Sequence, residues 1–164
     1  MPMSNFKFWG WDKKPRTMLR FVKPGDIYCF RLDDTRYCFG RIISKISMGH
    51  VAEIFDFISS EPNILETNIN EAKRIIDPMI IDTYSLFDKK IEPGSEWRII
   101  GHQDDFSPEN VDDIYFSYGV GNSCKKVDVF NNEYPITEED KSNCYTLTSR
   151  RDMYIKELIL NILS

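Results

Sequence analysis

Residues 23–58 constrain the fold more than any other part of the sequence. Their apolar side chains are mainly aromatic or β-branched, and polar breaks interrupt them at Pro24-Gly25, at residues 33–35 and at residues 47–50. Runs of this composition between turn residues predict strands. We therefore expect three consecutive strands, and the short link at residues 33–35 predicts a hairpin between the first two.

Successive side chains of these strands alternate between the two faces of a sheet. Tyr28 and Phe30 point one way, and Ile27 and Cys29 point the other way. Gly40 in the middle of the second strand predicts a bulge or a sharp bend, as a small barrel requires. With the helices expected below, the pattern predicts an α+β fold. Its sheet is either strongly bent and antiparallel or an SH3-like partial barrel.

The remaining elements are shorter. Asn68 and Glu71 resemble a capped helix start, and apolar residues at helical spacing continue that helix up to Pro78. Single helical turns are expected after Ser107 and after Thr137. Further strands are expected at residues 19–22, 79–87, 97–101, 114–118, 125–130 and 145–147, and a turn-rich link at residues 89–94.

The C-terminal segment, residues 150–164, predicts a helix without Gly or Pro. Ser149 and Asp152 resemble its capping box, and a wide apolar stripe should dock it on the sheet. The stripe consists of Tyr154, Ile155, Leu158, Ile159, Ile162 and Leu163.

The aromatic N-terminal segment is open to two interpretations. Phe6, Phe8, Trp9 and Trp11 either pack on the core or form a binding patch.

The overall composition restricts the class of protein. The 164 residues indicate a single domain, residues 1–164, and 41% hydrophobic content is ample for a core. The net charge of -5 disfavours nucleic-acid binding and suits a basic partner. We expect no membrane partner and a cytoplasmic location, because the sequence contains neither a signal peptide nor a membrane-length apolar run. The sequence does not indicate the oligomeric state.

The four cysteines predict no metal site and no cofactor. They form no Cys-x-x-Cys pair, and only two histidines accompany them. The favoured interpretation is buried free thiols, although a cross-strand contact between Cys29 and Cys38 is also conceivable.

Two groups of acidic residues are the candidate binding sites. Both could bind a partner, and the first could cover a basic cleft of that partner by mimicking phosphates. The plainer interpretation is a solvated loop for the first group and acids at a helix start for the second. The first group comprises Asp104, Asp105, Glu109, Asp112 and Asp113, and the second comprises Glu138, Glu139 and Asp140.

The two histidines offer little catalytic chemistry. His102 could act as a general base oriented by an Asp, but no nucleophile motif accompanies it, and a structural His at the end of a strand is favoured. Asp104, Asp105 and His102 have no diagnostic metal spacing. His50 lies in a predicted link and is expected to be exposed.

Several short blocks resemble a bacterial family, the immunity proteins numbered twenty-six in polymorphic-toxin systems. The blocks are Lys-Pro-Gly-Asp-Ile at 23–27, Arg-Tyr-Cys-Phe-Gly-Arg-Ile at 36–42, Ile-Phe-Asp at 54–56 and Trp-Arg-Ile-Ile-Gly-His at 97–102. They lie within about residues 20–102, whereas residues 103–164 contain no motif that can be aligned.

The resemblance implies an α+β immunity protein that binds and neutralises the C-terminal domain of a cognate toxin, often a nuclease. Both acidic groups are then candidate toxin-binding sites, and the basic cleft that the first could cover would be that of a nuclease. The resemblance implies no catalytic residue and no cofactor. The alternative is a barrel-type ribonuclease that uses Arg31, Arg36 or Arg41 with His102 at a phosphate.

Overall fold

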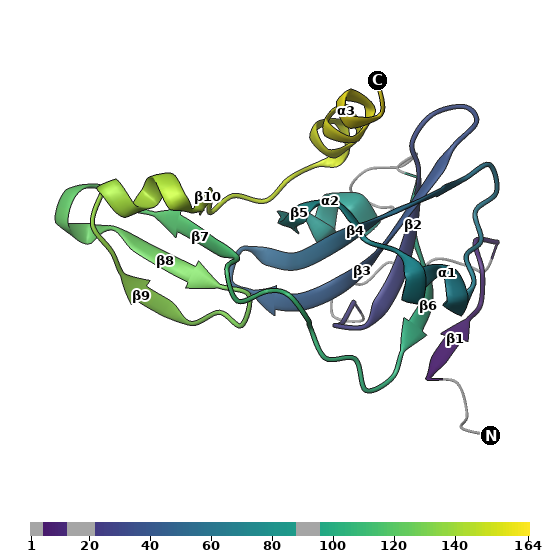
Figure 1. The fold of residues 1–164 in the computed structure, drawn as a ribbon, viewed down its shortest axis with the longest axis horizontal. Coiled ribbons are helices and arrows are strands. Elements are labelled where there is room, and N and C mark those ends of the chain that lie inside the picture. Colours follow the sequence, from purple (N-terminus) through teal and green to yellow (C-terminus); the bar gives the residue numbers. More distant parts are fainter. Residues whose placement is uncertain (1–4, 13–21, 88–95) are drawn as a thin grey trace.

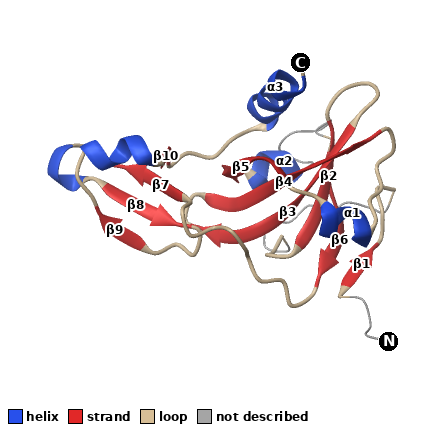
Figure 2. Ribbon diagram, in the orientation of Figure 1, coloured by secondary structure: helices blue, strands red, loops and turns tan. Residues whose placement is uncertain are grey.

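The computed structural model describes residues 5–12, 22–87 and 96–164, which form two β-sheets with helices beside them (Figures 1 and 2). The larger sheet has six strands in the order β1-β6-β2-β3-β4-β5, and each strand runs antiparallel to its neighbours. Its strands are β1 (Phe6–Phe8), β2 (Asp26–Arg31), β3 (Tyr37–Ile46), β4 (Gly49–Ser59), β5 (Arg74–Ile81) and β6 (Trp97–Gln103).

The smaller sheet has four strands in the order β10-β7-β8-β9, in which β10 runs parallel to β7. Its strands are β7 (Tyr115–Tyr118), β8 (Lys125–Asp128), β9 (Glu133–Pro135) and β10 (Tyr145–Thr146). The helices are α1 (Glu66–Glu71), α2 (Thr83–Phe87), α3 (Asp152–Leu163) and the 3-10 turns η2 (Gly121–Ser123) and η3 (Glu139–Asn143).

The predicted three-strand unit is confirmed as β2, β3 and β4. Arg31 pairs with Tyr37 across the predicted hairpin, and the Asp33 carboxylate accepts a hydrogen bond from the Thr35 backbone N–H. The register of β3 against β4 shifts between Cys38 and Gly40, where the bulge was expected. A Cβ on Gly40 would overlap the Glu53 carbonyl oxygen and the Tyr28 ring, so close packing as well as the bulge requires glycine there.

The central strands of the larger sheet bury both of their faces. Tyr28, Phe30 and Trp97 belong to a core on the face that α2 and α3 cover. Ile27 and Phe39 belong to a second core on the opposite face, where α1 packs. A layer on each side explains why these strands are almost continuously apolar.

A third apolar cluster connects the two sheets. Ile43 and Val51 extend from the larger sheet and meet Phe116 of β7 and Val129, which follows β8. The smaller sheet therefore continues from one end of the larger sheet and projects away from it, as Figure 1 shows.

The expectation of a strongly bent sheet or an SH3-like partial barrel is wrong in detail. A barrel requires the two outermost strands to pair, but β1 and β5 lie at opposite edges of an open sheet, and β9 and β10 are likewise separate edges. Register shifts, of which the one near Gly40 was predicted, bend the strands locally without closing the sheet. The coarser prediction, an α+β fold with a C-terminal helix, is confirmed.

The helix predicted to start at Asn68 begins earlier and is shorter than expected: it starts at Glu66, and its N-cap is Leu65. The α1 helix ends at Glu71, and Ile75, Ile76 and Pro78 lie in β5 instead. Proline is tolerated there because β5 is an edge strand. Pairing of Ile76 with Ile54 of β4 overrides the helical spacing of the apolar residues. The strand predicted over residues 79–87 likewise ends at residue 81, and residues 83–87 form α2.

The C-terminal helix is confirmed, although it buries less than predicted. Ile155 and Ile159 are buried in the core, and Asp152 at the start of α3 accepts a hydrogen bond from the Trp97 indole at 2.5 Å. Tyr154 and Ile162 remain exposed. The N-cap of α3 is Arg151 rather than Ser149, so the predicted capping box does not form.

The aromatic N-terminal segment packs on the core, which confirms the first of the two interpretations of this segment. β1 pairs with β6, the Trp9 indole donates to the Ile99 carbonyl at 2.8 Å, and the Trp11 ring lies against Tyr37 and Arg98. The edge strand predicted at residues 19–22 falls mainly outside the described residues, and the link at 89–94 falls entirely outside them.

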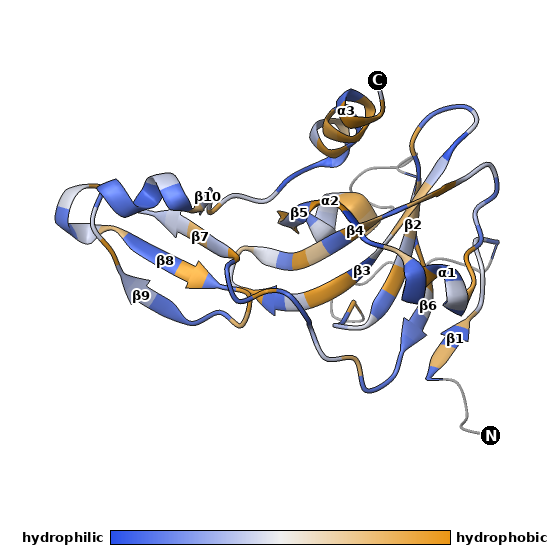
Figure 3. Cartoon of the chain, in the orientation of Figure 1, coloured by the Kyte–Doolittle hydropathy of each residue, from blue (hydrophilic) through white to orange (hydrophobic). Residues whose placement is uncertain are grey.

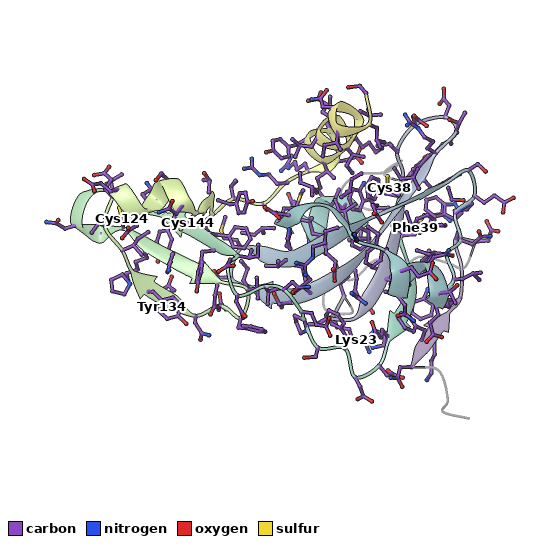
Figure 4. The ribbon with its side chains drawn as sticks, in the orientation of Figure 1. Lys23, Cys38, Phe39, Cys124, Tyr134 and Cys144 are labelled. Carbon is purple, nitrogen blue, oxygen red and sulfur yellow. The ribbon has the colours of Figure 1, made fainter. Side chains whose placement is uncertain are left out.

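The cysteines are free thiols. Cys29 lies opposite Phe39 in the register, and Cys38 lies opposite Phe30, so the two cysteines belong to cores on opposite faces of the sheet. Burial raises the pKa of both thiols, that of Cys38 to about 12. Cys124, which is buried as predicted, and Cys144, which is partly exposed, both lie in the region of the smaller sheet (Figure 4).

Candidate functional site

The first acidic group lies on the segment that connects β6 to β7. In Figure 1 this segment crosses from the larger sheet to the smaller one, and Figure 3 shows that it is mainly hydrophilic. All five acidic residues of the group are exposed. The helical turn predicted after Ser107 does not form: residues 106–109 have no regular secondary structure and lie between turns at 104–105 and 112–113. We call residues 104–113 the connecting segment.

The first turn of the connecting segment is tied to β1 and β6. The Asp104 backbone N–H donates to the Asn5 carbonyl at 2.8 Å, and its carboxylate lies 3.4 Å from His102 Nε2 and 4.0 Å from Lys7 Nζ. Asp105 follows with a φ of 57°, a left-handed conformation that Asp tolerates better than most residues. Asp104 is therefore partly neutralised, whereas Asp105 forms no ion pair with a described residue.

Arg74 holds the middle of the connecting segment. Its two terminal nitrogens donate to the carbonyl oxygens of Glu109 and Asn110, each at 2.6 Å. Its Nε donates to Glu53 at 3.1 Å, and the second oxygen of Glu53 accepts from Arg41 Nε at 2.9 Å. The Glu53 carboxylate is almost completely buried between the two guanidinium groups, so the segment is anchored to a buried ion network rather than to a surface contact.

The second acidic group lies at the predicted helical turn, which is confirmed as η3. The Asp140 carboxylate accepts from the Thr137 backbone N–H at 3.1 Å, and the Thr137 hydroxyl accepts from the Asp140 backbone N–H at 3.3 Å. These hydrogen bonds lower the pKa of Asp140. Asp140 is thus a capping residue, whereas Glu138 and Glu139 are exposed.

One groove brings Asp113 of the first acidic group close to the end of η3, the 3-10 turn that carries the second group. It has a volume of about 550 Å³ and lies between the connecting segment, the start of β5 and the end of η3. Asp113 and Asn110 line one side, and residues 142–145 line another. Asp77 of β5 adds a carboxylate that the sequence analysis missed. We call this the junction groove; Asp104 and Asp105 do not line it.

The sequence did not indicate Asp77 because the residues around its side chain are brought there by pairing between strands that are distant in sequence. It was expected at the end of a helix but lies in β5, where it accepts a hydrogen bond from the Tyr145 hydroxyl. This bond to a carboxylate raises the pKa of Tyr145 to about 12. Tyr145 follows η3 in the sequence, so the contact connects the two sheets across the junction groove.

His102 has a structural environment. Its Nδ1 lies 2.9 Å from the buried Asp26 carboxylate, which also accepts from the Lys23 backbone N–H at 3.0 Å. This pair closes the turn before β2. Within residues 5–12, 22–87 and 96–164, no group of three or more His, Cys, Asp or Glu side chains could hold a metal ion, and no helix is long and apolar enough to cross a membrane.

The arginines of the ribonuclease alternative do not converge on His102. Arg31 and Arg36 lie at the hairpin end of β2 and β3, where they pair with Glu96 and Asp33. His102 pairs with Asp26 at the opposite end of β2. Arg41 is the one arginine of the three near that end, and its Nε is bonded to Glu53.

The prediction that His50 is exposed is wrong. The side chain is buried, with Nδ1 2.7 Å from the Thr83 hydroxyl. Burial lowers the pKa of His50 to about 4, so the imidazole is neutral in the folded protein at neutral pH. Its position in β4, paired with Ile81 of β5, accounts for the burial.

Comparison with known proteins supports the resemblance noted in the sequence. The family model described as Immunity protein 26 matches residues 23–128. That range includes β2 to β8 and the whole connecting segment, and so reaches beyond the blocks that ended at residue 102. No curated protein and no solved structure matches the chain.

The chain belongs to the immunity protein 26 family. Membership implies that it neutralises a toxin, and proteins of this kind are typically inhibitors rather than enzymes. The first acidic group lies within the matched residues, and the second group lies outside them.

Proposed function

We propose that this protein binds a cognate toxin in the cytoplasm of the cell that makes both, and blocks it by direct occlusion. The proposed partner is the toxin's C-terminal domain, a nuclease with a basic substrate cleft. The proposed contact surface combines the connecting segment with η3, and the junction groove lies between them.

The observation that carries the proposal is a set of unpaired carboxylates on an anchored segment. Asp105, Asp112 and Asp113 are exposed, and their side chains form no ion pair with any described residue. Arg74, which is itself bonded to Glu53, holds the backbone of the same segment through the carbonyl oxygens of Glu109 and Asn110. Negative charges fixed in this way attract a basic partner without a large ordering cost.

The net charge of the whole chain supports the same partner. At -5 it favours association with a positively charged surface and disfavours direct nucleic-acid binding. A nuclease that binds a polyanion needs a basic cleft, and carboxylates spaced along a segment are a suitable substitute for phosphates there.

The first experiment is a co-expression test. The toxin domain encoded next to this reading frame is induced in a bacterial host with and without the chain. Restored growth and co-purification of the two proteins are expected. Killing that continues in the presence of folded chain would overturn the proposal.

The surface is tested by charge reversal with a matched control. The test variant combines Asp112→Lys with Asp113→Lys. The control combines Asp34→Lys, in the β2–β3 hairpin, with Glu61→Lys, after β4; both control positions are exposed, and the change in net charge is the same. At low salt the first pair should slow association about tenfold more than the second, because steering depends on charge near the contact. Equal association rates for the two double variants would exclude the connecting segment from the interface.

A further inference from the structure

A second hollow, beside the junction groove, has the opposite electrostatic character. It has a volume of about 470 Å³ and lies between β3, β4, the residues that join α1 to β5, and the connecting segment. Arg74 and Asn110 line both hollows. We call it the Arg41 pocket; the side chains that define it are Arg41, Glu53, Phe55, Lys73, Gln103 and Phe106.

Arg41 is held in a fixed position in this pocket. Its guanidinium carbon lies 4.4 Å from the centre of the Phe106 ring and 5.4 Å from that of Phe55. Its Nε donates to Glu53, and its Nη1 donates to the Gln103 side chain at 2.7 Å. A guanidinium carries five N–H groups, and Nη2 donates to no described residue. Arg41 therefore keeps N–H donors available for a ligand in a preorganised geometry.

The balance of the other charges leaves the pocket rich in donors. Both oxygens of Glu53 are already occupied by Arg41 and Arg74. Lys73 is exposed at the rim, and its ammonium group forms no ion pair with a described residue. Glu109, the other carboxylate that lines the pocket, is exposed and solvated. An incoming anion would meet free donors from Arg41 and Lys73, whereas an incoming cation would find no free buried acceptor.

We propose that the Arg41 pocket receives a carboxylate side chain, Asp or Glu, of the toxin. The inference rests on the proposed function and refines it, because the toxin would then carry an acidic residue beside its basic surface. A single carboxylate suits the planar donors of Arg41. A nucleic-acid strand does not, since the neighbouring carboxylates of the connecting segment would repel its other phosphates.

A positive pocket bordered by an acidic segment gives specificity as well as attraction. A partner with a uniformly basic surface satisfies the connecting segment but leaves Arg41 and Lys73 facing like charge. Such juxtapositions weaken binding and so reject wrong partners. The two neighbouring sites therefore fix the register in which a toxin docks.

The test uses Lys73→Glu and the toxin domain from the co-expression experiment, with affinity measured by calorimetry. Lys73→Glu should weaken binding by about 10- to 100-fold, because a like charge would face the incoming carboxylate. The control is Lys45→Glu, an equal charge change at an exposed position of β3 outside the pocket; it should leave the affinity within about twofold. Thermal unfolding of both variants verifies that they are folded.

A double-mutant cycle identifies the toxin residue. Each Asp or Glu of the toxin surface is changed to its amide and combined with Arg41→Lys, which keeps the charge but loses the planar donors. One acidic residue should show a coupling of at least fivefold with Arg41. Coupling below twofold at every position would overturn the inference, as would unchanged toxin affinity of Lys73→Glu.

Two further results distinguish a failure of the proposed function from a failure of the carboxylate inference. If wild-type chain does not bind the toxin at all, the proposed function fails rather than the pocket. If a single-stranded RNA oligonucleotide binds the wild type and loses affinity in Lys73→Glu, the pocket is a phosphate site, and the carboxylate inference is overturned.

Discussion

Removal of the Glu53 carboxylate should destabilise the protein and loosen the connecting segment. The Glu53 side chain is only 7% exposed and accepts hydrogen bonds from Arg41 and Arg74. In Glu53→Ala both guanidinium groups lose their common counter-ion. Deletion of one partner of a buried ion pair typically costs about 3–5 kcal/mol, because the remaining charge stays buried without compensation.

The structure places this variant near the lower end of that range. The two arginine side chains are 17% and 20% exposed, so water can partly solvate them. Each also retains an uncharged acceptor: Gln103 for Arg41, and the carbonyls of Glu109 and Asn110 for Arg74. We expect a loss of about 3 kcal/mol in the free energy of unfolding. For a chain of this length, that corresponds to a fall in Tm of roughly 6–12 °C.

The assay is urea unfolding followed by far-UV circular dichroism, with hydrogen exchange measured on the connecting segment. Glu61→Ala, at an exposed position, is the control and should change the free energy by less than about 0.5 kcal/mol. Amide exchange in residues 104–113 should accelerate in Glu53→Ala because Arg74 loses its orientation. A loss below about 1 kcal/mol would equal that of an ordinary surface pair and would refute the argument from burial.

Two further perturbations test other parts of the fold. The folded-state pKa of His50, about 4, is below its usual value of 6.5, so the unfolded chain binds a proton between these values and the folded protein does not. The corresponding stability, roughly 3 kcal/mol, is present above pH 6.5 and should be lost as the pH falls to about 4. In urea unfolding at pH 7 and pH 4.5, the free energy of unfolding of His50→Gln should depend less on pH than that of the wild type. An NMR titration midpoint of His50 near 6.5 would contradict the prediction. Asp152→Ala removes the acceptor of the buried Trp97 indole and should cost about 1–3 kcal/mol, with faster amide exchange in α3; unchanged exchange there would show that Ile155 and Ile159 alone hold the helix.

Local sequence patterns were sufficient for the central elements of the fold. The alternation of side chains along β2 correctly assigned Tyr28 and Phe30 to one face of the sheet and Ile27 and Cys29 to the other. The hairpin at residues 33–35 and the bulge at Gly40 also follow from residue type. These features depend on neighbours within a few positions, so a single sequence contains the relevant information.

The errors occur where long-range pairing outweighs local preference. Ile75 and Ile76 have helical spacing but pair with β4, and Pro78 is tolerated because β5 is an edge strand. Burial of His50 has the same origin, since β5 pairs beside it. Local propensities differ by less than about 1 kcal/mol per residue, which the burial of one large apolar side chain exceeds.

The candidate site shows the same division. The sequence by itself determined the acidic groups, the net charge and the blocks that resemble the immunity protein family. Only the tertiary structure joined Asp113 to Asp77 and to the end of η3, anchored the connecting segment on Arg74, and placed Arg41 between Phe55 and Phe106. A charge is a property of one residue, whereas a groove or a pocket requires several strands that are distant in sequence to pack together.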